Sequence, residues 1–367
     1  METTVENTEK KQIIIFLLVA YGVTWLMSIL MYVGLRKDVN LTSFVNTQMY
    51  YPACGVMLAK MTTKRKEEQL PIAAYICFLV GTVIMMTISV MTVFLPAIGL
   101  TITGGTTVDQ LISSVIIMLV SVPVYILFWT YGREARENAG VVRKNMGISA
   151  VLIALFIVLL ISRIALSLTF DGVFYGSVSD NWKEWISALS DAINTKAPSL
   201  QTSAWMLNLL SLPFNFFLTF SAFFGEEYGW RYFLQPIMMK KFGKIKGIIL
   251  LGLIWGLWHI CVDFMFYTTV DGPKMFVSQI ITCVSVGIFW GYAYMKTQNI
   301  WVTVIMHYLN NNLAVLIGGG TDASALQNQS VAWKDIPVLL ISSLVFAAFI
   351  FAKEYRENSA LEIGEEK

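Results

Sequence analysis

The chain has 367 residues, of which 56% are hydrophobic and only 14% are charged. A soluble domain carries roughly 25% charged residues, so this composition argues against a large soluble protein and favours an integral membrane protein. The net charge of +2 gives no indication of a nucleic-acid partner, and none is expected. Four cysteines are scattered through apolar stretches without a CxxC pair, which excludes a disulfide or zinc framework.

A helix crosses the apolar core of a bilayer with about 20 residues. The first apolar run, residues 13–35, is too long for a signal-peptide core and lacks a cleavage site, so it predicts a retained span. The sequence predicts an all-α bundle of about ten transmembrane helices. In chain order they cover residues 13–35, 42–59, 72–94, 110–130, 148–170, 213–237, 247–268, 275–295, 300–318 and 336–352.

Lysine and arginine are concentrated in alternate connections, whereas the loop 95–109 carries no positive charge. Positive residues mark the cytoplasmic side, so the pattern predicts an even number of spans with both termini in the cytoplasm.

Three regions are expected along the chain. Residues 1–203 would form an N-terminal membrane region that ends in an external amphipathic segment, 171–203. Residues 204–320 would form the catalytic core, and residues 321–367 the last span and a charged tail. The amphipathic segment is interpreted either as a surface helix packed on the bundle or as a gate for substrate.

Ionisable groups inside apolar runs are expensive, so they tend to mark functional sites. Residues 224–231 read FGEEYGWR. On an α-helix Glu227 and Arg231 share a face, which predicts that they pair. Glu226 points about 100° away from Glu227 and is free to act as a base. The alternative is a cytoplasmic helix end with solvated charges.

The only two histidines, His259 and His307, lie in two later apolar runs. Asp263 is four residues after His259, so it is expected to hold an imidazole N–H and fix the tautomer. His307 and Asn311 are also four apart and can both donate to a developing oxyanion. Asn310 and Asn312 point elsewhere and are expected to bond neighbouring helices. Glu226, His259 and His307 are predicted to lie at comparable depth, in the cytoplasmic half or the middle of the membrane.

The ordered motifs EExxxR, aromatic-xxx-His and HxxxN resemble the CPBP family, which contains type II CAAX prenyl endopeptidases and bacteriocin-processing and self-immunity proteins. The resemblance covers roughly residues 205–320 and implies an intramembrane peptidase. The wording of the motifs is similar to that of bacterial members, which implies a location in a bacterial plasma membrane. Trp255 stands where the family often has Phe, and Tyr232 where a small residue is common.

The resemblance also implies a role for each site residue. Glu226 would activate a water that His259 holds, and His307 with Asn311 would stabilise the oxyanion. Glu227 and Arg231 would orient the site.

The family is named for metalloproteases, yet the residues leave the cofactor open. Zinc would draw its ligands from Glu226, His259 and His307, an acceptable set. A metal-free water activated by Glu226 would use the same residues. The implied partners are the membrane and a peptide or membrane-protein substrate, with or without a lipid group.

Two other functions stay open. Glu, His, Asp and Arg163 inside spans also suit a proton-coupled transporter, although no inverted repeat is seen. A non-catalytic immunity or scaffold protein could keep the same fold.

Overall fold

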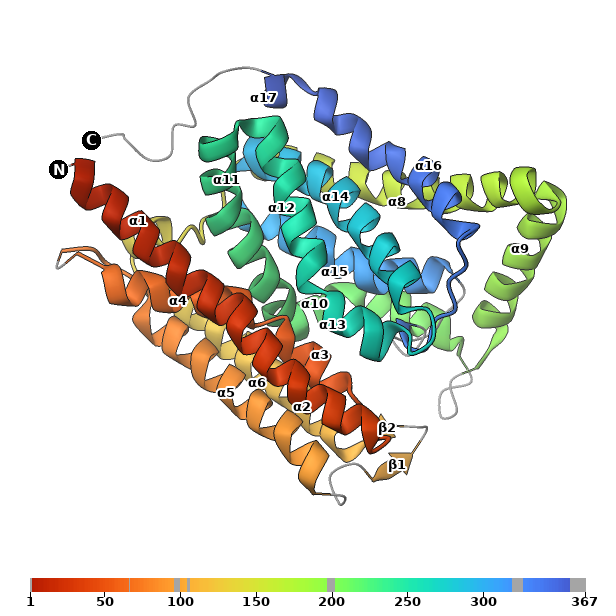
Figure 1. The fold of residues 1–367 in the computed structure, drawn as a ribbon, viewed down its shortest axis with the longest axis horizontal. Coiled ribbons are helices and arrows are strands. Elements are labelled where there is room, and N and C mark those ends of the chain that lie inside the picture. The colour runs from red at the N-terminus through yellow and green to blue at the C-terminus, as the bar shows by residue number, and fades with distance from the viewer. Residues whose placement is uncertain are drawn as a thin grey trace. The chain divides into compact units, whose positions relative to one another are not determined.

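The computed structural model describes residues 2–65, 67–95, 100–103, 106–196, 202–318 and 326–356. Regular structure in these residues is helical, except for a two-stranded antiparallel hairpin of β1 (Thr101–Thr103) and β2 (Thr106–Thr107) (Figure 1). The predicted helical fold class is confirmed. The small hairpin lies in the loop 95–109, which carries no positive charge, and it was not predicted.

Several α-helices continue directly into short π-helical or 3-10 segments, which are labelled η. In chain order the elements before β1 are α1 (Glu2–Leu17), η1 (Leu18–Val23), α2 (Thr24–Arg36), α3 (Thr42–Gln48), α4 (Tyr51–Thr63) and α5 (Ile72–Phe94). Those from β2 to the middle are α6 (Val108–Thr130), α7 (Arg133–Asn138), α8 (Met146–Tyr175), α9 (Val178–Asn194), α10 (Ala204–Glu227), η3 (Tyr228–Leu234) and α11 (Gln235–Phe242). The last are α12 (Lys244–Trp258), α13 (Ile260–Val262), η4 (Asp263–Tyr267), α14 (Gly272–Thr297), α15 (Ile300–Ile317), α16 (Asp335–Ala347), η6 (Ala348–Phe351) and α17 (Lys353–Arg356).

Seven helices among the described residues are long and apolar enough to cross a membrane. The count becomes eight if the bent pair Lys244–Trp258 and Ile260–Tyr267 forms one span. The predicted number of ten is therefore not confirmed. The stretch 42–59 is divided into α3 and α4 by a turn that precedes Pro52, and the apolar helix Asp335–Phe351 is too short. The cytoplasmic location of both termini stays a prediction.

The chain divides into two compact units, and each is described by itself. Unit 1 comprises Met1–Arg143 and Phe214–Trp230, and unit 2 comprises Lys144–Pro213 and Arg231–Lys367. The boundaries fall inside α10 and inside η3, so the helix that carries Glu226 contributes to both units. The three regions predicted from the sequence were drawn by expected role, whereas the two units are defined by how compactly their residues pack. The three regions therefore stay a prediction.

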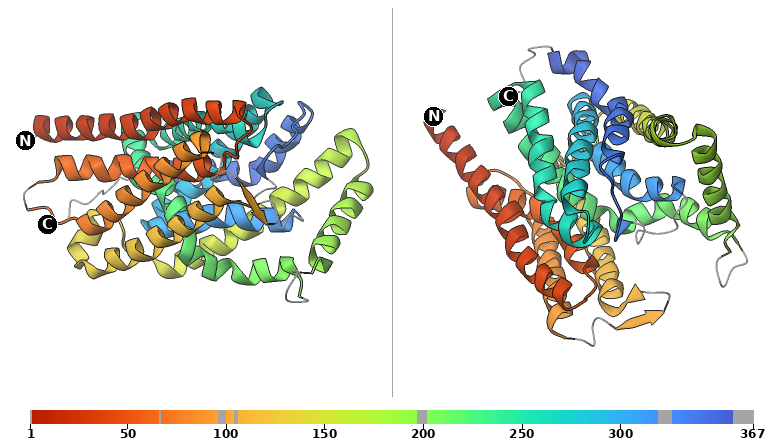
Figure 2. Two further views of the ribbon diagram at one scale, coloured as in Figure 1. Left: turned by 90° about the horizontal axis from the view of Figure 1, so that it is seen from below. Right: turned by 45° about the vertical axis from the view of Figure 1, so that its right-hand side comes forward.

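In unit 1, the long helix formed by α1, η1 and α2 lies along α4, and α5 packs against α6 (Figure 2). The α5–α6 contact is close at Gly81, where an added Cβ would lie 2.1 Å from a methyl of Val120. Polar side chains bridge the helices inside this unit: Ser43 Oγ donates to Asp109 Oδ2 over 2.5 Å. Such bonds satisfy buried polar groups that cannot form hydrogen bonds with water.

In unit 2, α14 packs against α12 and α16, and α16 also lies along α8 (Figure 1). Two glycines of α12 permit the closest approach. A Cβ on Gly252 would lie 2.7 Å from Val284 Cα, and one on Gly256 would lie 3.2 Å from Ile280 Cα. This small-xxx-small spacing lets two helix backbones approach closely in an apolar environment. It brings α12, which ends just before His259, against α14.

Replacing Gly252 with Ala is expected to destabilise the protein, because the new methyl group meets backbone atoms that cannot move aside. Overpacking of this kind lowers the free energy of unfolding by about 1–3 kcal/mol. Thermal unfolding in detergent measures the change. The matched control is Gly147→Ala in α8, where nothing lies within 4 Å of an added Cβ. An unchanged unfolding midpoint in Gly252→Ala would contradict the close α12–α14 contact.

The amphipathic segment predicted for 171–203 forms the end of α8 and all of α9. Trp182 Nε1 donates to Thr169 Oγ1 over 3.3 Å, and Trp185 Nε1 donates to the Ile317 carbonyl over 3.0 Å. The two tryptophans thus pack on helices of their own unit, which agrees with the surface-helix interpretation. Residues 197–201 lie outside the described part of the chain, and a gating role stays a prediction.

Candidate functional site

Glu226 and Glu227 are the last residues of α10 and belong to unit 1. Their side chains are buried, with 3% and 0% of their surface exposed. Two glycines flank them and allow close packing: a Cβ on Gly225 would lie 2.3 Å from the Met49 carbonyl, and one on Gly229 would lie 2.3 Å from Pro52 Cβ. The burial excludes the alternative of a solvated helix end.

Hydroxyl groups fix this part of α10 within unit 1. Tyr228 OH donates to the Ala139 carbonyl over 2.8 Å and lies 2.7 Å from Tyr75 OH. Seven residues earlier, Ser221 Oγ lies 2.6 Å from Tyr50 OH and 2.7 Å from Ser121 Oγ. These bonds hold the helix on both sides of Glu226 and leave its carboxylate little freedom to move along the axis.

The helix changes type directly after the carboxylates. Tyr228–Leu234 form a π-helix, in which backbone bonds join residues five apart. The expectation that Glu227 and Arg231 share a face assumed a regular α-helix. In a π-helix, residues four apart no longer lie directly above one another, so their pairing stays a prediction. Single π-helical turns are frequent at functional sites.

Arg231 belongs to unit 2 and is fully buried. Its Nη1 donates to the Gly287 carbonyl over 3.3 Å, and Gln235 Nε2, one turn on, donates to the Gly291 carbonyl over 3.1 Å. An added Cβ on Gly287 would lie 3.7 Å from both terminal nitrogens of Arg231. The guanidinium therefore lies close to the α14 backbone at Gly287, which has no side chain to intervene.

Two indole rings complete the surroundings of Arg231. Its guanidinium carbon lies 5.0 Å from the centroid of Trp255 and 5.8 Å from that of Trp290. Aromatic faces attract a cation at this range, and more strongly when both are removed from water. A buried charge needs such compensation.

His259 follows the last residue of α12, where the helix axis bends by 42° before η4. Its Nδ1 lies 2.9 Å from the Trp255 carbonyl. A carbonyl oxygen only accepts, so Nδ1 is the donor, and Nε2 of the neutral ring carries the free lone pair. The ring is 8% exposed and packs edge-on to Trp258, with 5.0 Å between centroids. Nε2 is suited to accept a hydrogen bond from water.

Asp263 does not hold His259 as the spacing predicted, because the imidazole N–H is taken by Trp255. Side chains on a helix lean toward its N-terminus, which turns the ring of His259 back to residue 255 and away from residue 263. Asp263 is fully buried, and neither carboxylate oxygen has a hydrogen-bond partner among the residues described.

His307 lies in α15 and is 5% exposed. Its ring centroid lies 5.9 Å from Trp255, which also contacts His259 at 5.9 Å. The two imidazoles of unit 2 therefore meet at one indole, although they come from different helices.

The three asparagines of α15 bond within their own helix. Asn310 Nδ2 donates to Asn311 Oδ1 over 3.1 Å, and Asn312 Nδ2 donates to the Tyr308 carbonyl over 2.9 Å. The prediction that Asn310 and Asn312 bond neighbouring helices is wrong, because acceptors on α15 itself are within reach. Asn311 Oδ1 accepts this bond, and Asn311 Nδ2 donates to no other group among the described residues, so its hydrogens remain available.

No group of three or more His, Cys, Asp and Glu side chains within the described ranges is placed to hold a metal ion. The zinc-ligand set considered from the sequence, Glu226, His259 and His307, is thus not supported. The bond from His259 Nδ1 to the Trp255 carbonyl leaves Nε2 free, an arrangement that suits either a water molecule or a metal ligand. Metal dependence therefore stays open, and no step is derived through a metal.

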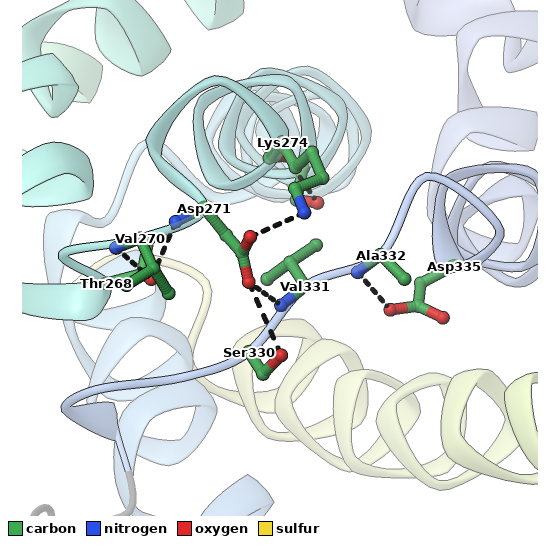
Figure 3. Close-up of polar contacts among 9 residues, drawn as sticks. Thr268, Val270, Asp271, Lys274, Ser330, Val331, Ala332 and Asp335 are labelled. Atoms are coloured by element: carbon green, nitrogen blue, oxygen red, sulfur yellow. Dashed lines mark hydrogen bonds and ion pairs between the residues drawn. The ribbon is translucent and has the colours of Figure 1, made fainter.

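A loop of unit 2 is tied to the segment that follows His259 (Figure 3). We call residues 326–332 the strap. Val331 N donates to Asp271 Oδ2 over 3.0 Å, and Ser330 Oγ donates to the same oxygen over 3.3 Å. Lys274 Nζ pairs with Asp271 Oδ1 at 2.5 Å. Backbone bonds from Asn328 and Gln329 to the carbonyls of Phe266 and Tyr267 join the strap to η4.

Lowering the pH is expected to loosen the strap. The hydrogen bond from Lys274, followed by that from Val331, holds the pKa of Asp271 below its usual range. A lowered folded-state pKa stabilises the protein fully above the ordinary carboxyl value of about 3.9, and the contribution is lost as the pH falls through the folded pKa. Thermal unfolding of wild type and Asp271→Asn, from pH 7 to pH 3, measures the contribution of the Asp271 carboxylate to stability.

The difference between the two unfolding midpoints should be constant above about pH 4 and shrink below. Asp180→Asn, at a carboxylate that is 72% exposed, provides the control and should change nothing. A difference that grows as the pH falls would contradict the role of Asp271.

Sequence reasoning missed Trp290, Gly287 and Gly291, which surround Arg231. The four-residue glycine spacing on α14 was a readable signal for close packing. The sequence gives no sign that Trp290 has a special role, because a single aromatic residue in an apolar helix normally indicates packing alone.

Residues 208–313 match the family model described as type II CAAX prenyl endopeptidase, Rce1-like. This segment belongs to the CAAX protease family. The family core runs from the middle of α10 into α15 and holds all four predicted catalytic residues. Comparisons with the curated proteins and with the solved structures gave no significant match. With its long apolar helices, the CAAX-protease-like chain is an integral membrane protein.

Proposed function

We propose that the protein is an intramembrane endopeptidase that hydrolyses a peptide bond near the cytoplasmic face of a bacterial plasma membrane. The observation that carries the proposal is the family match, whose range includes Glu226, His259, His307 and Asn311. The burial of these carboxylate and imidazole groups adds support, since isolated ionisable groups are retained in a membrane mainly for function.

Glu226 is the proposed general base. Its carboxylate takes a proton from a water molecule whose other hydrogen is bonded to Nε2 of His259. The water oxygen attacks the carbonyl carbon of the peptide. This role agrees with the proton position on His259, because the bond to the Trp255 carbonyl leaves Nε2 as the acceptor.

The attack turns the carbonyl oxygen into an oxyanion. A ring N–H of His307 and the amide of Asn311 donate to it in the proposed mechanism, which stabilises charge that exists only during the reaction. The tetrahedral intermediate then breaks at the C–N bond, and the proton on Glu226 moves to the leaving amine. Glu227 and Arg231 are proposed to orient the site.

The proposed substrate is a peptide segment attached to or inserted in the membrane. The family description names prenylated CAAX proteins as one class. A leader peptide or a membrane protein would present the same scissile amide.

The test compares peptides released from membranes that contain wild-type protein with those from membranes that contain Glu226→Gln. Mass spectrometry identifies peptides present in the first set alone, and the new termini define the cleaved bond. A farnesylated CAAX peptide and its unlipidated counterpart, added as probes, show whether a lipid group is required. Identical peptide sets, together with no cleavage of either probe, would refute the endopeptidase and favour an immunity or scaffold role.

A further inference from the structure

Trp290 lies in α14 among residues of the proposed site, but it belongs to none of the motifs. It is 1% exposed. Its ring faces His307 at 5.0 Å between centroids, with 39° between the planes, and contacts Trp255 at 5.6 Å. Phe156 of α8 packs edge-on to it at 6.0 Å. All four rings belong to unit 2.

The indole restricts how the imidazole of His307 can turn. The χ2 torsion of histidine has broad, shallow minima, so the direction of the ring nitrogens depends on what packs against the ring. Trp290 covers one side of His307 at a low tilt, and Trp255 meets it edge-on at 76°. Offset and edge-to-face arrangements are the favoured aromatic contacts.

The contribution of Trp290 comes from its ring. Its Nε1–H is buried and has no hydrogen-bond partner among the described residues, so polar bonding does not explain the residue. The same ring also lies 5.8 Å from the Arg231 guanidinium. Trp290 therefore contacts a buried cation and a proposed oxyanion donor at once.

We infer that Trp290 is a positioning residue that fixes the ring of His307 for donation to the oxyanion. This inference rests on the proposed function. Misplacing a group by about 1 Å can cost about 100-fold in rate. Removing the aromatic ring should therefore lower kcat, whereas substrate binding, which does not use His307, should stay the same.

The experiment compares Trp290→Leu and Trp290→Phe on a farnesylated CAAX peptide with a fluorophore and a quencher on either side of the scissile bond. Trp290→Leu should lower kcat about 10- to 100-fold, with KM within about 2-fold. Trp290→Phe keeps an aromatic face and lacks the N–H, so it should retain most of the activity. A loss in Trp290→Phe as large as in Trp290→Leu would overturn the inference.

A double-mutant cycle with His307→Ala separates positioning from general packing. If Trp290 acts through His307, Trp290→Leu should cost less than about 2-fold once His307 is absent. An equal loss in both backgrounds would overturn the inference. Where Trp290→Leu fails to fold, Trp290→Met replaces it in the cycle.

A second readout does not depend on cleavage. Diethyl pyrocarbonate modifies imidazoles, and the digested protein reports each histidine separately, so His259 serves as the internal reference. His307 should react faster in Trp290→Leu than in wild type, and an unchanged rate would overturn the positioning role. If instead Glu226→Gln cleaves normally, the proposed function fails, whatever the reactivity of His307.

Discussion

Replacing Glu226 with Gln is expected to abolish peptide cleavage while the protein remains folded and inserted. Glutamine has nearly the same shape, so the packing of Gly225 and Gly229 against Met49 and Pro52 is retained. The amide cannot accept the proton of the attacking water. General-base catalysis contributes about 100- to 10,000-fold, and kcat should fall by this amount. The rate of probe cleavage in detergent micelles measures the loss.

Glu184→Gln is the matched control, because the same chemical change is made at an exposed position of α9. It should cleave like wild type. Thermal unfolding of Glu226→Gln, compared with wild type, distinguishes a chemical defect from a folding defect. A folded Glu226→Gln that retains more than about a tenth of the wild-type kcat would exclude the general-base role.

Replacing Asn311 with Leu should lower kcat about 100- to 1,000-fold, the typical cost of losing one oxyanion donor. The amide hydrogens of Asn311 are available, because Asn311 Nδ2 donates to no other group among the described residues. Leu has a similar volume and cannot donate. Because the bond is stronger in the transition state than in the ground state, KM should change little.

Asn312→Leu provides the comparison on the same helix. Asn312 donates only to the Tyr308 carbonyl of its own helix, an acceptor that the helix backbone already uses. Its loss should leave kcat within about 2-fold and move the unfolding midpoint slightly. Equal losses of kcat in the two variants would show that Asn311 has no special role in the reaction.

The helices were readable from the sequence because hydrocarbon admits almost no unpaired backbone, so a span must be a long apolar helix. Because this constraint applies to each segment separately, hydropathy identifies a long unbroken span well. It identifies short or broken helices less well. The stretch 42–59 is divided before Pro52, and the α12 span is bent at His259. Length and hydropathy do not report such breaks, which explains the surplus over the seven or eight helices found.

The candidate site residues stand out in the sequence as charged and imidazole groups in apolar runs, and the family match includes their positions. Their local partners were less predictable. The expectation for Asp263 failed because His259 bonds backward to the Trp255 carbonyl. The π-helix at Tyr228–Leu234 removed the regular spacing assumed for Glu227 and Arg231.

The sequence by itself determined a helical membrane protein, the family of its core, and which residues can carry acid and base chemistry. These properties follow from composition and from motifs along one chain. Only the tertiary structure decided that His259 and His307 share the indole of Trp255, and that Trp290 contacts both Arg231 and His307. Contacts between helices depend on where glycines permit close approach and on side-chain rotamers. The hydropathy of a single segment predicts neither.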